Sequence, residues 1–354
     1  MRRILTVIVI LLLFLFAATQ SHHLISFRRK GLPDAYTGFS ADTPPALSFV
    51  IAGLGGFRGI VSEVLWFRVS RLQEEGRYLE LVQLADWIAR LDPHASEAWV
   101  YNAWNLAYNV SVMMIRSEDR LRWVQNGVAL LRDDALRFNP REARLYRELA
   151  WLYQNKIGDS LDSAHLTYKI ALAESMSSLV NPDGSVCTTP ESRVRLGKLK
   201  LDADRMSILE HRFGPLDWRL AESHAIYWAY QGLEYATGAE RLMSRRGVYQ
   251  PLILSVVRGR FTGDLTIKQW QTAPNLPLAD ATADFIAETL KEFPSKTLTN
   301  VYINYLLISI QMFNKSRDTQ SANAFYRRLL LVLPQGQPYP KLDDVLNGWR
   351  LKDE

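Results

Sequence analysis

This sequence contains little of the side-chain chemistry from which metal, redox and hydrolytic sites are built. Its 354 residues include a single cysteine, Cys187, and six histidines. One cysteine excludes an intramolecular disulfide and any zinc site made of cysteine ligands. The histidines lack the His-Glu-x-x-His spacing of zinc proteases, and no Gly-x-Ser-x-Gly nucleophile elbow occurs. We therefore predict no cofactor, no metal site and no enzyme activity.

Two short segments still bring carboxylates and histidines close together. Asp162 and His165 have the i, i+3 spacing that places both on one face of a helix, and Glu222 and His224 lie near Asp217. Neither pair is a self-sufficient motif, so we interpret both as ordinary hydrogen-bonding groups. A convergent cluster of Asp217, Glu222 and His224 in the folded chain would instead favour a catalytic site.

Excess basic charge is also missing from most of the chain. The formal net charge is +5, and the first thirty residues hold five basic side chains and no acidic one. Removing these five from the 42 basic residues leaves 37, which the 37 acidic residues balance. Because binding to a phosphate backbone needs a concentrated basic surface, we predict no nucleic-acid partner.

The longest apolar run lies at the amino terminus, over residues 4–18, after Arg2 and Arg3. As a helix these residues span about 22 Å, against a hydrocarbon core of about 30 Å. Residues 1–20 therefore fit a signal peptide or a short signal anchor. The segment Ala17–Ser21 is a poor cleavage site, so we predict a single uncleaved anchor in the cell membrane, with a cleaved secreted form as the alternative. The Arg-Arg start is typical of export signals, which places the body on the periplasmic or extracytoplasmic side.

The next region, residues 21–61, divides into a linker and an apolar packing segment. The linker, Ser21–Pro45, is polar and contains several prolines and glycines. The packing segment, Ala46–Phe57, is apolar and glycine-rich but too short to span a bilayer. We interpret it as a buried or interfacial segment, with a re-entrant membrane contact as the alternative.

Residues 62–173 repeat one helix-turn-helix pattern three times, and helices predominate beyond them. In the first copy, Gly76 and Tyr78 mark the turn and Pro93 ends the second helix. This pattern resembles tetratricopeptide repeats, although bulky Leu81 and Ile88 stand where that family prefers small residues. The later copies carry the resemblance through Trp99, Ala103, Leu106, Ala135 and Pro140, and through Tyr146, Leu149, Ala150, Tyr153, Ala164, Tyr168 and Ala171. The resemblance implies an all-α solenoid of helical hairpins with a concave face.

Beyond residue 173 the repeat register is lost. We predict an irregular helical region with loops over 174–277, carboxyl-terminal helices over 278–335 that form a possible degenerate repeat, and a polar tail over 336–354. Within the irregular region, Asp217 is a candidate helix cap. The β-branched residues of Gly247–Gly263 predict a short extended segment or hairpin.

The first helix of the second repeat is apolar on two sides. At 100° per residue, Ala103 and Leu106 fall near Trp99 and form the core stripe, whereas aromatic residues gather on the opposite side. In tetratricopeptide repeats the face opposite the core lines the concave groove. The corresponding groove residues in this sequence are Trp66, Phe67, Tyr101, Trp104, Asn105, Tyr108, Asn109, Arg147 and Trp151.

Aromatic anchors beside amide groups suit the capture of an extended or helical protein segment. The function that we predict is therefore a membrane-tethered scaffold or adaptor with a protein partner. Three alternatives remain open at this stage. The chain's own segments fill the groove, the protein is a structural subunit of a membrane complex, or residues 174–277 form a glycan-handling or hydrolytic module.

Overall fold

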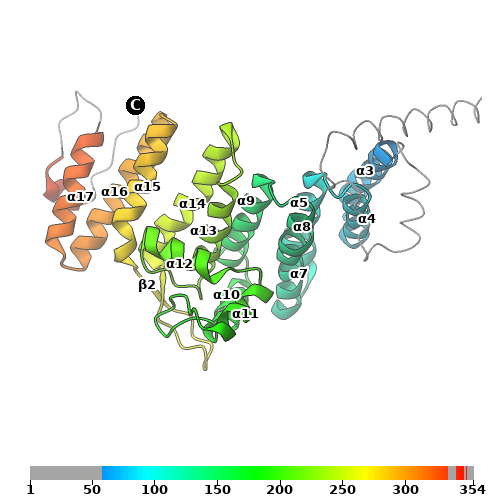
Figure 1. The fold of residues 1–354 in the computed structure, drawn as a ribbon, viewed down its shortest axis with the longest axis horizontal. Coiled ribbons are helices and arrows are strands. Elements are labelled where there is room, and N and C mark those ends of the chain that lie inside the picture. Colours follow the sequence, from blue (N-terminus) through cyan, green and yellow to red (C-terminus); the bar gives the residue numbers. More distant parts are fainter. Residues whose placement is uncertain (1–57, 334–339, 347, 349–354) are drawn as a thin grey trace, which may run out of the picture. The chain divides into compact units, whose positions relative to one another are not determined.

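The computed structural model describes residues 58–333, 340–346 and 348, and it is mostly helical (Figure 1). The predicted all-α class is confirmed. The predicted anchor over residues 4–18, the linker, the packing segment Ala46–Phe57 and most of the tail lie outside the described residues. In the described part, no helix is both long and apolar enough to cross a membrane.

The chain divides into two compact units, and the boundary lies after Asn102, inside one helix. In the first unit, a tight turn at Gly76 reverses the chain between two helices. Gly76 has φ +67°, and the N–H of Arg77 donates to the carbonyl of Leu72 at 2.9 Å. A residue with a Cβ is strained in this left-handed conformation, which explains glycine at the turn. The helices of this region are α3 (Arg58–Glu74), α4 (Tyr78–Leu91) and α5 (Ser96–Trp104).

The helices of the first unit bury large aliphatic side chains against each other. Leu72 of α3 and Leu81 and Ile88 of α4 are each at most 2% exposed. Leu81 and Ile88 are the two bulky departures from the repeat pattern, and the core accommodates both of them. Trp99 is buried, and its Nε1 donates to the carbonyl of Pro93 at 2.9 Å.

The second unit continues with two helix pairs whose long helices contain π-helical turns. Each π turn widens the helix locally and accommodates extra residues without a break. The extra residues between Ser111 and Arg122 therefore lengthen the helices, and only residues 114–116 form the connecting loop. The elements are η3 (Asn105–Val110), α6 (Ser111–Met113), α7 (Ser117–Ala129), η4 (Leu130–Ala135), α8 (Leu136–Phe138), α9 (Ala143–Trp151), η5 (Leu152–Ile157) and α10 (His165–Ser177).

Helix α13 is the centre of the second unit. All residues from Ala221 to Ala229 are buried, because α13 packs against both α9 and α14 (Figure 1). A helix that is buried on every side carries no amphipathic pattern of its own. The helices of this region are α11 (Pro190–Lys198), α12 (Ala203–Phe213), α13 (Ala221–Gly232) and α14 (Gly238–Arg258).

The prediction of an extended segment over Gly247–Gly263 is wrong. Most of it belongs to α14, which continues through Pro251, and strands form only at β1 (Arg260–Phe261) and β2 (Thr272–Ala273). Val248, Leu252 and Val256 recur every four residues and are fully buried on one face of the helix. Tertiary burial therefore outweighs the β propensity of the valines.

The carboxyl-terminal helices follow the sequence prediction closely. The Ser295 hydroxyl accepts a hydrogen bond from the N–H of Leu298, and the Asp318 carboxylate accepts one from the N–H of Ser321. Each side chain caps the helix that follows it. Helix α15 packs on α14, and α16 packs on α17 (Figure 1). The elements are η6 (Leu276–Leu278), α15 (Ala279–Glu292), α16 (Lys296–Lys315), α17 (Thr319–Val332) and α18 (Leu342–Leu346).

Candidate functional site

Three of the predicted groove residues form one stacked row of aromatic rings in the second unit. The ring of Trp104 lies 4.7 Å from that of Tyr108 and 6.1 Å from that of Trp151, measured between centroids. The interplanar angles are 27° and 23°, so the rings are nearly parallel. We call Tyr108, Trp104 and Trp151 the aromatic row.

The aromatic row is held by two neighbouring helix pairs. Trp104 is the last residue of α5, Tyr108 lies in η3, and Trp151 is the last residue of α9. The indole Nε1 of Trp104 donates to Oε2 of Glu148 at 3.0 Å, which fixes the orientation of the central ring. The other oxygen of Glu148 accepts a bond from Arg147 at 3.1 Å. Contacts within the chain therefore fix the orientation of the row.

Trp151 is the most exposed ring of the row. Tyr108 and Trp104 are half-buried, and Trp151 is 43% exposed. Burial raises the pKa of Tyr108 to about 12, so its hydroxyl is neutral at physiological pH. The row thus presents an uncharged aromatic surface beside the carboxylate of Glu148. Such a surface binds apolar side chains and can accept hydrogen bonds at one edge.

Arg147 is engaged within the chain. Its guanidinium forms ion pairs with Glu148 and with Glu240 of α14. Its side chain is 23% exposed. Part of the predicted groove position at Arg147 is therefore covered by α14, which agrees in part with the alternative that the chain fills its own groove. We assign Arg147 to the support of Glu148 and not to partner contact.

The prediction that Asn105 lines the groove differs from the structure. Asn105 is 3% exposed, whereas Asn109 is half-buried and donates from Nδ2 to Oδ1 of Asn105 at 2.6 Å. Asn105 is the first residue of the π turn η3, and the residues after it no longer follow the 100° spacing of a regular α-helix. Asn105 is thus a buried support for Asn109. Asn102 is also buried.

Two of the remaining groove residues, Trp66 and Tyr101, form an aromatic pair in the first unit. The rings of Trp66 and Tyr101 meet edge to face with centroids 5.2 Å apart. The Tyr101 hydroxyl donates to Oε1 of Gln73 at 2.6 Å. Phe67 is 76% exposed. Each unit therefore carries its own group of partly exposed aromatic rings.

A buried ionic cluster lies beside Tyr108. The ammonium of Lys156, in η5, lies 5.0 Å from the Tyr108 ring centroid and 2.5 Å from Oδ2 of Asp162. The hydroxyl of Tyr168 donates to the same oxygen at 3.2 Å. Burial alone raises the pKa of Asp162, but Lys156 and the N–H of Ala164 outweigh it and hold that pKa below its ordinary value.

Sequence reasoning missed Lys156, although a signal was present. Leu149, Leu152 and Lys156 follow the i, i+3, i+7 spacing of a buried stripe, and all three are at most 3% exposed. A lysine on such a stripe requires an acidic partner. The partner is Asp162, whose i, i+3 spacing to His165 suggests a different pairing in the sequence. In the structure, Nδ1 of His165 instead lies 3.2 Å from the ammonium of Lys169.

Asp217 has a different role from the predicted helix cap. Its carboxylate accepts bonds from Nε of Arg219 at 2.8 Å and from the N–H of Phe261 at 2.8 Å, and no side chain caps α13. It thereby joins the start of α13 to the short hairpin. Trp218 is fully buried, and its Nε1 donates to Glu210 at 2.7 Å. The segment around Trp218 therefore packs inside the chain.

Asp217, Glu222 and His224 are all buried but do not converge. Glu222 pairs with Arg258 at 2.9 Å, while Nε2 of His224 lies 3.0 Å from the carbonyl oxygen of Trp218. Burial raises the pKa of Glu222 and lowers the pKa of His224 to about 4. Among the described residues, no group of three or more His, Cys, Asp or Glu side chains could hold a metal ion.

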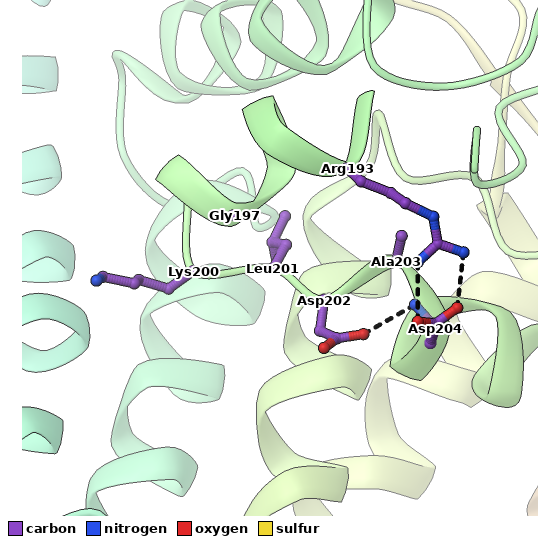
Figure 2. A pocket seen from close by; sticks show the side chains of 7 residues that line it. All are labelled: Arg193, Gly197, Lys200, Leu201, Asp202, Ala203 and Asp204. Atoms are coloured by element: carbon purple, nitrogen blue, oxygen red, sulfur yellow. Dashed lines mark hydrogen bonds and ion pairs between the residues drawn. The ribbon is translucent and has the colours of Figure 1, made fainter. Parts of the chain in front are cut away.

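A shallow hollow lies between α11 and α12. Figure 2 shows Arg193 reaching across it to Asp204, and the two nitrogens of its guanidinium bind the two carboxylate oxygens at 2.8 and 2.7 Å. Asp202 caps α12 through bonds from two backbone N–H groups. Because Arg193 and Asp204 bind each other and Asp202 caps a helix, this hollow is a weaker candidate than the aromatic row.

No model of a known protein family matches this sequence, and no curated protein matches it at a significant level. The resemblance to tetratricopeptide repeats stays a prediction from the sequence. Among the described residues, the aromatic row is the strongest candidate for a functional site.

Proposed function

We propose that this protein is a membrane-tethered adaptor of the tetratricopeptide-repeat type whose aromatic row binds a segment of another protein. The consecutive helix pairs α3 with α4, α5 to α8, and α9 with α10 support the repeat assignment, because the chain reverses between two helices in each pair, over residues 75–77, 114–116 and 158–164. In this proposal the aromatic row of the second unit lines the concave face of the repeats.

The exposed ring of Trp151 carries the proposal. An indole side chain buries about 250 Å² when it is fully covered, so the 43% of Trp151 that is exposed corresponds to about 100 Å². At about 25 cal/mol per Å², covering this area contributes about 2.5 kcal/mol to binding. This value is typical of an interface hot spot, at which tryptophan is enriched.

The row is also rigid, which lowers the entropic cost of binding. Trp151 stacks on Trp104, and Trp104 is fixed by Glu148 and by the ring of Tyr108. A partner that covers this surface does not have to immobilise free rotamers, each of which costs about 0.5 to 1.5 kcal/mol. A protein segment with apolar side chains and a backbone N–H or a cation facing Glu148 fits this surface.

The apolar run over residues 4–18 supplies the membrane tether in this proposal. Confinement to the membrane surface raises the effective concentration of the domain toward partners in or near the same membrane. A moderate affinity at the aromatic row is then sufficient for stable association.

A crosslinked pull-down of the membrane-tethered full chain tests the proposal. The double variant Trp104→Ala, Trp151→Ala is compared with the parent and with Trp87→Ala, a matched control because Trp87 is 57% exposed and lies on α4 in the other unit. We expect a specific protein partner to be lost from the double variant and retained by the control. Retention of the same partners by a double variant with an intact helical spectrum would move the binding site elsewhere.

A further inference from the structure

Two loops of the second unit expose aliphatic side chains at the ends of their helices. The first loop joins α6 to α7, and Ile115 in it is 98% exposed. The second joins η5 to α10, and Leu161 in it is 89% exposed. Val112, Met113 and Leu166, next to these loops, are each between 46% and 49% exposed. We call these five residues the aliphatic tips.

Arg120 of α7 holds the two loops side by side. Its Nε donates to the carbonyl of Met114 at 2.8 Å, and its NH2 group lies 3.3 Å from the carbonyl of Val112. Its NH1 group donates to Oγ of Ser163 at 3.0 Å and to Oδ1 of Asp162 at 3.2 Å. One guanidinium thus bonds both loops, and α7 packs against α10.

Other hydrogen bonds satisfy backbone N–H groups of the same two loops. The N–H of Met114 donates to the carbonyl of Ser111 at 3.1 Å, and the N–H of Ala164 donates to Asp162 at 2.9 Å. Asp162 is in turn held by buried Lys156. Backbone groups that enter an apolar medium must be paired within the protein, and the N–H groups of Met114 and Ala164 are.

We propose that the aliphatic tips rest in the interface of a lipid bilayer and form a second membrane contact beside the tether. This inference rests on the tether of the proposed function. The tips lie in and beside the two loops that Arg120 joins. A bilayer can cover them without having a complementary shape. They are aliphatic throughout, whereas hot spots between proteins are enriched in tryptophan, tyrosine and arginine. Aliphatic side chains reach the boundary between headgroups and acyl chains.

The charged side chains beside the aliphatic tips determine whether the contact depends on anionic lipid. Arg116 and Arg122 are exposed, but they face Glu118 and Asp119 at 3.7 and 3.2 Å. The patch therefore carries little net charge. Apolar burial drives this contact, and it does not depend on anionic lipid.

Fluorescence of the full chain in phosphatidylcholine vesicles tests the inference. In a Cys187→Ser background, a polarity-sensitive dye is attached to Ile115→Cys or to Leu161→Cys. The control is Leu331→Cys on α17, because Leu331 is 85% exposed. We expect a blue shift, and loss of most of the emission with nitroxide-labelled acyl chains, at positions 115 and 161 but not at position 331. The same result is expected when anionic lipid is added.

The outcomes separate this inference from the proposed function. Flotation of the chain with the vesicles reports the tether by itself. A chain that floats while its dyes at 115 and 161 remain as accessible to water as the dye at 331 overturns this inference alone. A blue shift without quenching by the nitroxide lipids also overturns it, because the tips are then covered by protein. A chain that does not float overturns both the tether and this inference.

Discussion

The indole of Trp104 lies nearly parallel to that of Trp151, with ring centroids 6.1 Å apart, although the two residues belong to different helix pairs. Glu148, one turn before Trp151 on α9, accepts the indole N–H of Trp104. The packing of the two helix pairs and the shape of the exposed aromatic surface therefore depend on the same contact. A change at Trp104 affects both, whereas a change at Trp151 affects mainly the surface.

Alanine at position 104 is expected to destabilise the fold more than alanine at position 151. Trp104→Ala removes a half-buried ring and its bond to Glu148, and we expect a loss of about 2 to 3 kcal/mol in the free energy of unfolding. Trp151→Ala removes a ring that is 43% exposed, and we expect about 1 kcal/mol or less. Urea unfolding of both variants measures the difference. Equal losses would show that Trp151 belongs to the core.

Lys156 is expected to be essential for the stability of the second unit. Lys156→Met leaves Asp162 buried without its closest cation, and removal of one partner of a buried ion pair costs about 3 to 5 kcal/mol. The matched control is Lys198→Met, since Lys198 is exposed in the last turn of α11. We expect a change within about 0.5 kcal/mol for the control. Thermal or urea unfolding gives both values, and similar effects would contradict the buried-pair assignment.

Gly184 is expected to tolerate no side chain. It has φ +90°, and a Cβ at this position would collide with the carboxylate of Asp217. Gly184→Ala therefore adds a clash to the backbone strain. Gly76→Ala has the strain alone, about 1 to 2 kcal/mol, because nothing lies within 4 Å of a Cβ there. Chemical unfolding should show the larger loss for Gly184→Ala, and a smaller or equal loss would argue against the packing of this loop on Asp217.

His224 is expected to make the folded chain sensitive to acid. Burial lowers its pKa from the ordinary 6.5 to about 4 in the folded protein. As the pH falls below about 6.5 the unfolded chain binds a proton that the folded chain does not, so stability is lost down to about pH 4. A shift of this size corresponds to about 3 kcal/mol. We expect His224→Gln to reduce the slope of unfolding free energy against pH between pH 6.5 and 4. An unchanged slope would show that His224 titrates normally.

The sequence predicts most helices of this chain because their boundaries are encoded locally. Ser295 and Asp318 cap the helices after them, and Gly76 permits the left-handed turn between α3 and α4. Trp99, Ala103 and Leu106 are buried, as their spacing predicts. These features need only a few neighbouring residues.

Helix α14 and the support of the candidate site depend on contacts that are distant in sequence. Val248 and Val256 favour strands locally, and only burial within the second unit makes them helical. Asp217 bonds to Phe261, and Trp104 bonds to Glu148, over separations of 44 residues in both cases. Asn105 is buried, and the π turn that begins there changes the helical spacing of the residues after it. No local pattern specifies these contacts.

Site-specific photocrosslinking at position 151 tests the central claim most directly. A benzoyl-phenylalanine replaces Trp151 in the membrane-tethered full chain, and the same probe replaces Trp87 as the control. We predict one discrete protein adduct at position 151 that is lost when Trp104→Ala is added, and none at position 87. No adduct at position 151, or the same adduct at both positions, would contradict a binding function for the aromatic row.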